Sequence, residues 1–80
     1  MPYLYILHSA SIDKFYVGST SGTPEERLKK HLTNHSGFTG KAKDWKIVHR
    51  EFFDSAELAR QRELQVKAWK SKYKILELIA

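Results

Sequence analysis

The chain has no cysteine among its 80 residues. Disulfide bonds and thiolate zinc sites are therefore excluded, and a reducing cytoplasm is the simplest location for the protein. Long apolar runs are also missing, so no segment is expected to span a membrane. Residues 1–7 lack a basic segment followed by a long apolar one, and we therefore expect no signal peptide.

Acidic residues are scarce in the middle of the chain. From Arg27 to Arg50 there are seven lysines or arginines and one acid, Asp44. A second basic group follows between Arg60 and Lys74, and the net charge of the whole chain is +5. This balance favours a polyanionic partner such as nucleic acid, although a solvated basic surface accounts for it about equally well.

Apolar residues make up 41% of the sequence, which is enough for one modest core in a single domain, residues 1–80. Hydrophobic periodicity predicts six elements in the order strand, strand, helix, strand, helix, helix. The expected residues of these elements are 3–8, 15–18, 23–34, 45–53, 54–72 and 73–80. This order predicts an α+β fold in which a small three-stranded, mostly antiparallel sheet is flanked by helices.

Local signals support these boundaries. The sequence Thr-Pro-Glu-Glu at 23–26 combines an N-cap, a proline at the first helical position and a capping box. A second capping box at 54–57 opens the long helix. In the third strand, strict alternation predicts two faces. One face is expected to hold Trp45, Ile47, His49, Glu51 and Phe53, and the other Val48 and Phe52.

Glu63 interrupts the apolar stripe of the long helix. Ala59 lies four residues before it and Val66 three residues after it, so all three share one helical face. A carboxylate on a buried face requires compensation by a cation or by hydrogen bonds. Two readings follow: a metal ion bound by Glu63, or an ion pair. The partner in such a pair would be Arg60 or Arg62 on the same helix, or Arg27 or a lysine from elsewhere. Arg62 is a poor local partner because adjacent residues do not face each other on a helix.

Other polar and aromatic residues recur near the expected hairpin and first helix. Tyr3 and Tyr5 point to one face of their strand because side chains alternate. Gly18, which ends the second strand, permits a sharp turn and a close approach to the backbone. Arg27 and His31 are four residues apart and project from one helix face. Taken singly, each of these residues has an ordinary structural explanation.

Taken together, these residues resemble the GIY-YIG endonuclease family over essentially the whole chain. Tyr3-Leu4-Tyr5 corresponds to the first triplet of that family and Tyr16-Val17-Gly18 to the second. Arg27 and His31 follow on the next helix, and Glu63 lies where the family has its acidic residue. The chain is most similar to the small single-domain bacterial members, which are related to the N-terminal nuclease domain of the excision-repair incision enzyme.

The chain departs from the family pattern at three positions. Tyr3 replaces the first glycine, and Val17 replaces isoleucine. Ser19 stands where some members carry a lysine, a charge that Lys29 or Lys30 would have to supply.

The resemblance implies a metal-dependent DNA endonuclease that acts in repair or on branched DNA. Glu63 would bind one Mg²⁺ or Mn²⁺ ion, and Arg27 would hold the charge of the phosphate. Tyr5, Tyr16 and His31 are the alternatives for the general base, and the resemblance favours Tyr16. A free tyrosine has a pKa of roughly 10, so it needs nearby positive charge to act near neutrality.

Nucleic-acid contacts are expected from six further residues. These are Tyr3, Gly18, Lys29, Lys30, Lys41 and Lys43. The alternative function is a non-catalytic nucleic-acid-binding or interaction module that keeps the same fold. A nuclease of this size has little surface for sequence readout, so it would rely on DNA shape, on a homodimer or on a partner protein.

Overall fold

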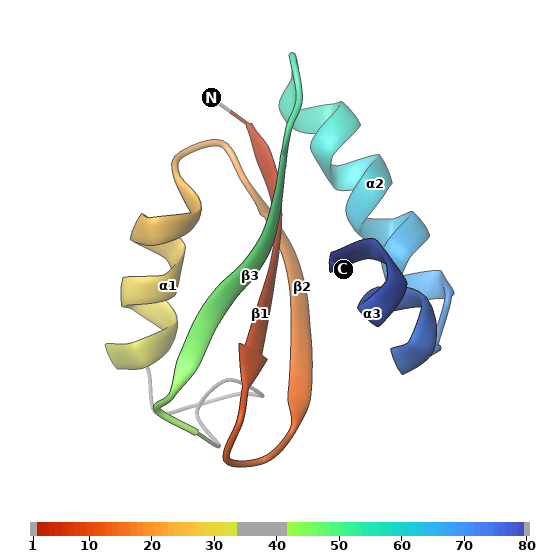
Figure 1. Ribbon diagram of the computed structural model, residues 1–80. Coiled ribbons are helices and arrows are strands. Elements are labelled where there is room, and N and C mark those ends of the chain that lie inside the picture. The colour runs from red at the N-terminus through yellow and green to blue at the C-terminus, as the bar shows by residue number, and fades with distance from the viewer. Residues whose placement is uncertain (1, 34–41, 80) are drawn as a thin grey trace.

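The computed structural model describes residues 2–33 and 42–79. It contains three strands and three helices in the expected order, which confirms the α+β prediction (Figure 1). The elements are β1 (Tyr3–Ser9), β2 (Lys14–Thr20), α1 (Pro24–Thr33), β3 (Trp45–Phe52), α2 (Ala56–Ala68) and α3 (Lys72–Ile79). No helix within the described ranges is both long and apolar enough to cross a membrane.

The three strands form one sheet in the order β2-β1-β3, and both pairings are antiparallel. A short turn joins β1 to β2 as a hairpin, with Ser9 opposite Lys14 and Tyr5 opposite Gly18. The central strand is therefore β1, and β2 forms one edge of the sheet.

The two faces of β1 bury two separate apolar clusters. Leu4 and Ile6 pack with Val66 on the side covered by α2 and α3. Tyr5 and Leu7 pack with Trp45 on the side covered by α1. Figure 1 shows this layering, with α1 on one side of the sheet and the other two helices on the opposite side.

The predicted alternation of β3 is wrong because the strand contains an irregularity. The pairing with β1 shifts register between Ile6, which lies opposite His49, and Leu7, which lies opposite Ile47. Val48 is the extra residue, as in a β-bulge, so the strand changes faces at this point. Trp45 and Ile47 pack in the cluster beneath α1, whereas Phe53 packs with Val48 in the cluster beneath α2 and α3.

The helix starts largely follow the capping signals. The Thr23 hydroxyl accepts a hydrogen bond from the backbone N–H of Glu26 at 3.3 Å. In α2 the N-cap is Ser55, one residue later than the expected Asp54, and its side chain accepts from the N–H of Leu58 at 3.2 Å. Both hydroxyls satisfy donors that lack a partner within the helix.

The end of α2 differs from the sequence prediction. The helix stops at Ala68 instead of continuing to Lys72, because Lys70 adopts a left-handed conformation with φ 50°. A residue in this conformation just beyond a helix reverses the chain direction and ends the helix. The chain then begins α3 as a separate helix.

Asp44 ties the hairpin turn to the start of β3. Its carboxylate accepts hydrogen bonds from the hydroxyls of Ser9, at 2.5 Å, and Ser11, at 3.0 Å, and from the Ser11 backbone N–H at 2.8 Å. These donors stabilise the ionised form, with the Ser9 hydroxyl making the largest contribution, and lower the pKa of Asp44 to about 2.

Because β1 is buried, a small truncation on this strand should destabilise the protein more than a larger truncation at an exposed site. Ile6 is fully buried, whereas the Leu64 side chain on α2 is 57% exposed. Ile6→Val should lower the free energy of unfolding by about 0.5–1.5 kcal/mol. Leu64→Ala removes more carbon atoms but should change it by only about 0.5 kcal/mol, because the site is largely solvated. Urea titration measures both values, and a larger loss for Leu64→Ala would contradict this view of the core.

Candidate active site

The hairpin places Tyr5 and Tyr16 together on the α1 side of the sheet. Their ring centroids lie 6.3 Å apart, and the Tyr5 side chain is almost fully buried. A Cβ atom built on Gly18 would lie 2.5 Å from the Tyr5 hydroxyl oxygen. Glycine is therefore required at position 18 so that the Tyr5 ring can cross the neighbouring strand. The sequence predicted that some group would approach the backbone closely at Gly18. In the structure that group is the Tyr5 side chain.

Helix α1 brings Arg27 and His31 to the same two tyrosines. Nε2 of His31 lies 3.1 Å from the Tyr5 hydroxyl oxygen, and its ring centroid is 4.7 Å from that of Tyr16. The Arg27 guanidinium also hydrogen-bonds the Tyr5 hydroxyl. Because arginine only donates, the Tyr5 oxygen accepts from Arg27 and its proton remains available for His31. A neutral His31 whose Nε2 is unprotonated can accept that proton in a hydrogen bond, which completes the series Arg27–Tyr5–His31.

Burial and charge set the protonation of the cluster. Burial raises the pKa of Tyr5 above its ordinary value, and the hydrogen bond from Arg27 offsets this only in part. Burial also lowers the pKa of His31, and the positive charge of Arg27 lowers it further. Both side chains are therefore neutral near pH 7, with Tyr5 as a phenol and His31 as an imidazole.

Arg27 carries a charge that no nearby acid in the described part of the chain neutralises. Within residues 2–33 and 42–79, no carboxylate lies at ion-pair distance from its guanidinium. Its Nε atom is buried and has no hydrogen-bond partner. An unsatisfied buried donor is unfavourable by about 1–3 kcal/mol. The planar donor fork of arginine suits phosphate oxygens, so the charge of Arg27 fits an anionic ligand.

Glu63 approaches the same region from α2, on the other side of β2. Its side chain is 17% exposed. Oε1 accepts a hydrogen bond from the Ser19 hydroxyl at 2.6 Å, and Oε2 lies 2.5 Å from Nζ of Lys67. Burial alone would raise the pKa of Glu63, but the contacts with Lys67 and Ser19 outweigh it and the pKa is lowered. The carboxylate is also close enough to raise the pKa of Tyr5.

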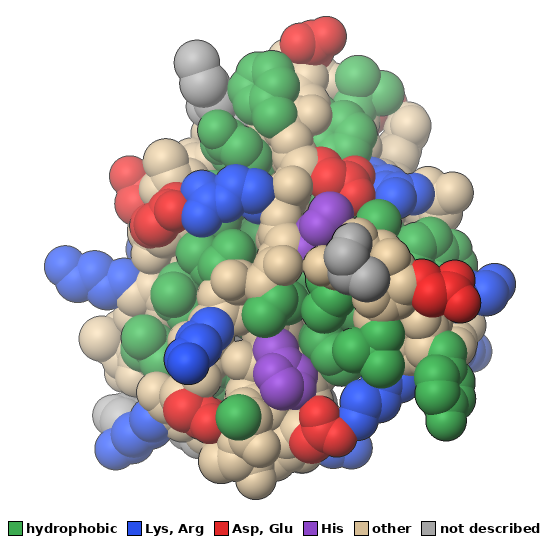
Figure 2. Space-filling model, in the orientation of Figure 1, with side chains coloured by type: hydrophobic (Ala, Val, Ile, Leu, Met, Phe, Trp, Pro, Cys, Tyr) green, Lys and Arg blue, Asp and Glu red, His purple; other side chains and the backbone are tan. Residues whose placement is uncertain are grey.

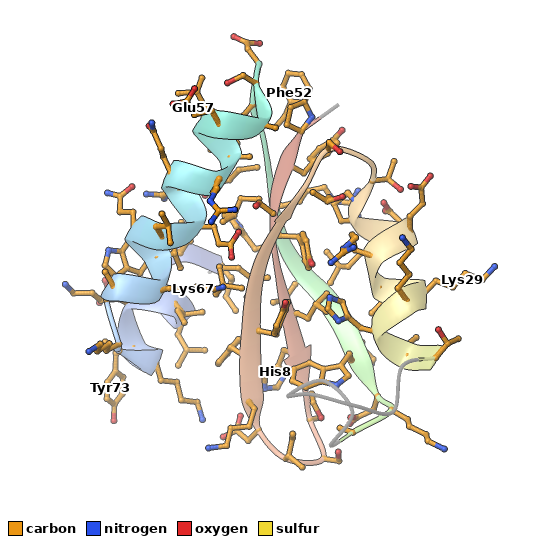
Figure 3. All side chains as sticks on the ribbon, turned by 180° about the vertical axis from the view of Figure 1, so that it is seen from behind. His8, Lys29, Phe52, Glu57, Lys67 and Tyr73 are labelled. Carbon is orange, nitrogen blue, oxygen red and sulfur yellow. The ribbon has the colours of Figure 1, made fainter. Side chains whose placement is uncertain are left out.

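The remaining predicted residues lie away from this cluster. The Tyr3 ring packs edge-on against Phe52, with centroids 5.6 Å apart. Lys29 and Lys30 are exposed on α1, and Lys29 points away from the sheet (Figure 3). Lys43 is exposed in the segment before β3. The prediction for Lys41 lies outside the described residues.

The sequence reasoning missed the partners of Glu63. Ser19 gives no sequence signal, because it meets Glu63 only when β2 packs against α2. Lys67 does give a signal, since a glutamate followed four residues later by a lysine is a common helical ion pair. Arg62 instead binds Glu51 on β3, with its Nε 3.0 Å from Oε1. This agrees with the expectation that Arg62 is a poor local partner for its neighbour.

A family model of the GIY-YIG catalytic domain matches residues 1–75. The chain therefore belongs to the GIY-YIG family. No curated protein and no solved structure matched the chain in the same comparisons. Family membership indicates a nuclease in general terms, a hydrolase whose implied substrate is DNA.

Nucleases of this family generally use a divalent metal ion. The described residues contain no cluster of three or more metal-ligating His, Cys, Asp or Glu side chains. Mg²⁺ nevertheless needs only one or two carboxylates, since it keeps several waters and binds substrate phosphates as well. Glu63 is ionised and half-buried, and the Ser19 oxygen lies beside it. This oxygen-only donor set fits a hard cation, provided that Lys67 releases Oε2.

The lowered pKa of His31 predicts a pH dependence of folding. A histidine that is harder to protonate when folded contributes stability fully above its unfolded pKa of about 6.5. That contribution is lost as the pH falls through the lower folded pKa. An NMR titration should give a pKa below 6.5 for His31, and Arg27→Met should raise it by removing a neighbouring charge. Arg60→Gln is the control. An unchanged His31 pKa in Arg27→Met would contradict the effect assigned to the charge of Arg27.

Proposed function

We propose that residues 1–80 act as one divalent-metal-dependent DNA endonuclease domain that hydrolyses phosphodiester bonds. The observation that carries this proposal is the Arg27 guanidinium, which has no acid partner among the described residues and lies beside a tyrosine–histidine cluster. An ionised carboxylate approaches from the opposite side of β2. A cation without an acid partner and an anion held nearby suit a phosphate and a metal ion respectively. A plain structural network would pair the two charges with each other.

Arg27 would hold the phosphate that is being cleaved. Its guanidinium lies beside the Tyr5 hydroxyl, so the charge is already in the site before substrate arrives. Charge that develops on the phosphate oxygens then meets a donor that needs no reorganisation. Tyr5 acts here as a positioning residue between Arg27 and His31, because burial keeps its hydroxyl protonated.

Glu63, with the neighbouring Ser19 oxygen, would hold the divalent cation. A bound Mg²⁺ or Mn²⁺ ion supplies Lewis-acid polarisation of the phosphate and stabilises the leaving oxygen. The Ser19 hydroxyl orients the carboxylate by donating to Oε1. Hydrogen bonding to a liganding carboxylate in this way fixes its direction.

Tyr16 is the proposed general base. It is half-buried, whereas Tyr5 is almost fully buried and already engaged with Arg27 and His31. Tyr16, in its deprotonated form, would take a proton from the attacking water and return to the hydroxyl form. Neutral His31, packed edge-on against the Tyr16 ring, would position that water or the phosphate.

The biological setting follows from the resemblance to small single-domain bacterial members of the family. We propose a cytoplasmic enzyme that acts in DNA repair or on branched DNA. Recognition would depend on DNA shape, on a homodimer or on a partner protein, since the domain is small.

Glu63→Gln should abolish Mg²⁺-dependent cleavage while DNA binding survives. The amide keeps the shape of the side chain but removes the charge that would hold the cation. Cleavage is measured on plasmid, branched and single-stranded DNA with Mg²⁺, Mn²⁺ or chelator. Binding of Mn²⁺ is followed independently by electron paramagnetic resonance and should weaken in the same variant.

Glu57→Gln is the matched control, because Glu57 is an exposed acid on the same helix (Figure 3). Retained cleavage by Glu63→Gln would contradict the assignment of Glu63 as the residue that holds the cation. If the wild-type protein binds DNA in a salt-sensitive manner but cleaves none of the substrates, the chain is a non-catalytic binding module.

Tyr16→Phe should lower the cleavage rate by about 10²–10⁴-fold, the usual contribution of a general base. It should also change the pH–rate profile, since the side-chain oxygen proposed as the base is gone. Tyr73→Phe is the control, because Tyr73 is 79% exposed on α3. If Tyr16→Phe keeps the wild-type rate and profile, another residue is the base.

A further inference from the structure

A basic groove lies on the side of the sheet opposite the tyrosine cluster. It lies between β2 and the junction of α2 with α3 and encloses about 310 Å³. Four lysines and four apolar side chains are among the residues that line it. These are Lys14, Lys67, Lys70, Lys72, Phe15, Val17, Val66 and Ile75.

Positive charge in this groove is only partly compensated. Asp13 also lines it, but its carboxylate is bound by Lys72 and lies 3.0 Å from Nε2 of His8. Among the residues that the structure describes, neither Lys14 nor Lys70 has a carboxylate at ion-pair distance. By contrast, the face of the molecule in Figure 2 shows basic and acidic side chains interspersed.

The conformation of Lys70 is a second observation. Lys70 and Asp13 are the non-glycine residues with positive φ in the described parts of the chain. Glycine is the usual residue at such a helix end, because it adopts the left-handed conformation without steric strain. Aspartate tolerates this conformation, whereas lysine gains nothing from it locally. A lysine here indicates a use for its side chain, and that side chain lines the groove.

The groove adjoins the candidate active site through Lys67. Nζ of Lys67 contacts Glu63, and the same side chain lines the groove from α2 (Figure 3). A nucleic-acid strand that leaves Glu63 on this side would therefore enter the groove directly. The floor is apolar, and Phe15 is half-buried against the His8 ring with centroids 4.7 Å apart. Phosphates suit the lysines, and the exposed sugar and base of an unpaired nucleotide suit the floor.

We propose that this groove binds an unpaired strand of the nucleic acid next to the cleavage position. Lys14 and Lys70 contact two successive phosphates, and the apolar floor takes the nucleotide between them. This inference rests on the proposed nucleic-acid substrate but not on cleavage, so a binding measurement tests it separately.

The test combines Lys14→Gln with Lys70→Gly, and Lys46→Gln with Lys74→Gln serves as the charge-matched control. Lys46 and Lys74 are exposed and do not line the groove. Fluorescence anisotropy in chelator follows binding to a labelled single-stranded oligonucleotide and to a blunt duplex of the same length. A denaturing gel verifies that the oligonucleotide stays intact.

The groove variant should bind the single strand roughly tenfold or more weakly at about 0.1 M salt. The slope of log K against log salt should become shallower by about 1.4, because two contacts with a single strand are lost. The urea midpoint should stay the same or rise, since Lys70→Gly relieves backbone strain. This combination separates a binding role from a structural one.

Three results would overturn the proposal. The first is an unchanged affinity and slope, and the second is an equal loss in the control variant, which would indicate net charge alone. The third is an equal loss on the blunt duplex, which would exclude an unpaired strand. If the wild-type protein cleaves no substrate but the groove variant shows the expected loss, the proposed endonuclease activity fails and the groove assignment stands.

Discussion

The structure depends on the burial of both faces of β1. This strand lies at the centre of the sheet, and its alternating side chains build two different interiors. Leu4 and Ile6 anchor α2 and α3, whereas Tyr5 and Leu7 anchor α1. A small domain buries limited apolar surface, so most of its buried residues are needed for the core and few can serve only a polar function. Here Tyr5 serves both purposes, because its ring fills the core while its hydroxyl reaches Arg27 and His31.

The candidate site is built around an edge strand. Gly18 and Ser19 are adjacent in β2, so they face opposite sides of the sheet. Gly18 makes room for the Tyr5 ring on one side, and Ser19 holds the carboxylate of Glu63 on the other. Because no further strand from the described residues covers this edge, groups from the two helical layers can meet beside it. The proposed strand-binding groove extends from the same edge toward α3.

Charge compensation differs between the two halves of the site. Glu63 is matched within the protein by Lys67 and Ser19, which keep the carboxylate ionised despite its burial. Arg27 has no acid partner among the described residues, and its hydrogen-bond partner is the neutral phenol of Tyr5. A local network left with net positive charge attracts a phosphate, and the Lys67 contact can be exchanged for another cation. The asymmetry therefore favours a ligand over a purely structural network.

The sequence by itself determined the elements, their order and the residues from which the site is drawn. Apolar periodicity and capping signals are local, so they can be read without knowing the fold. The shared helix face of Arg27 and His31 and the misplaced charge of Glu63 are local in the same sense. Only the tertiary structure decided the register shift at Val48, the left-handed residue Lys70 and the contact of Glu63 with Ser19. These features depend on which strands and helices pack together, and a one-residue shift in pairing moves side chains to the other face.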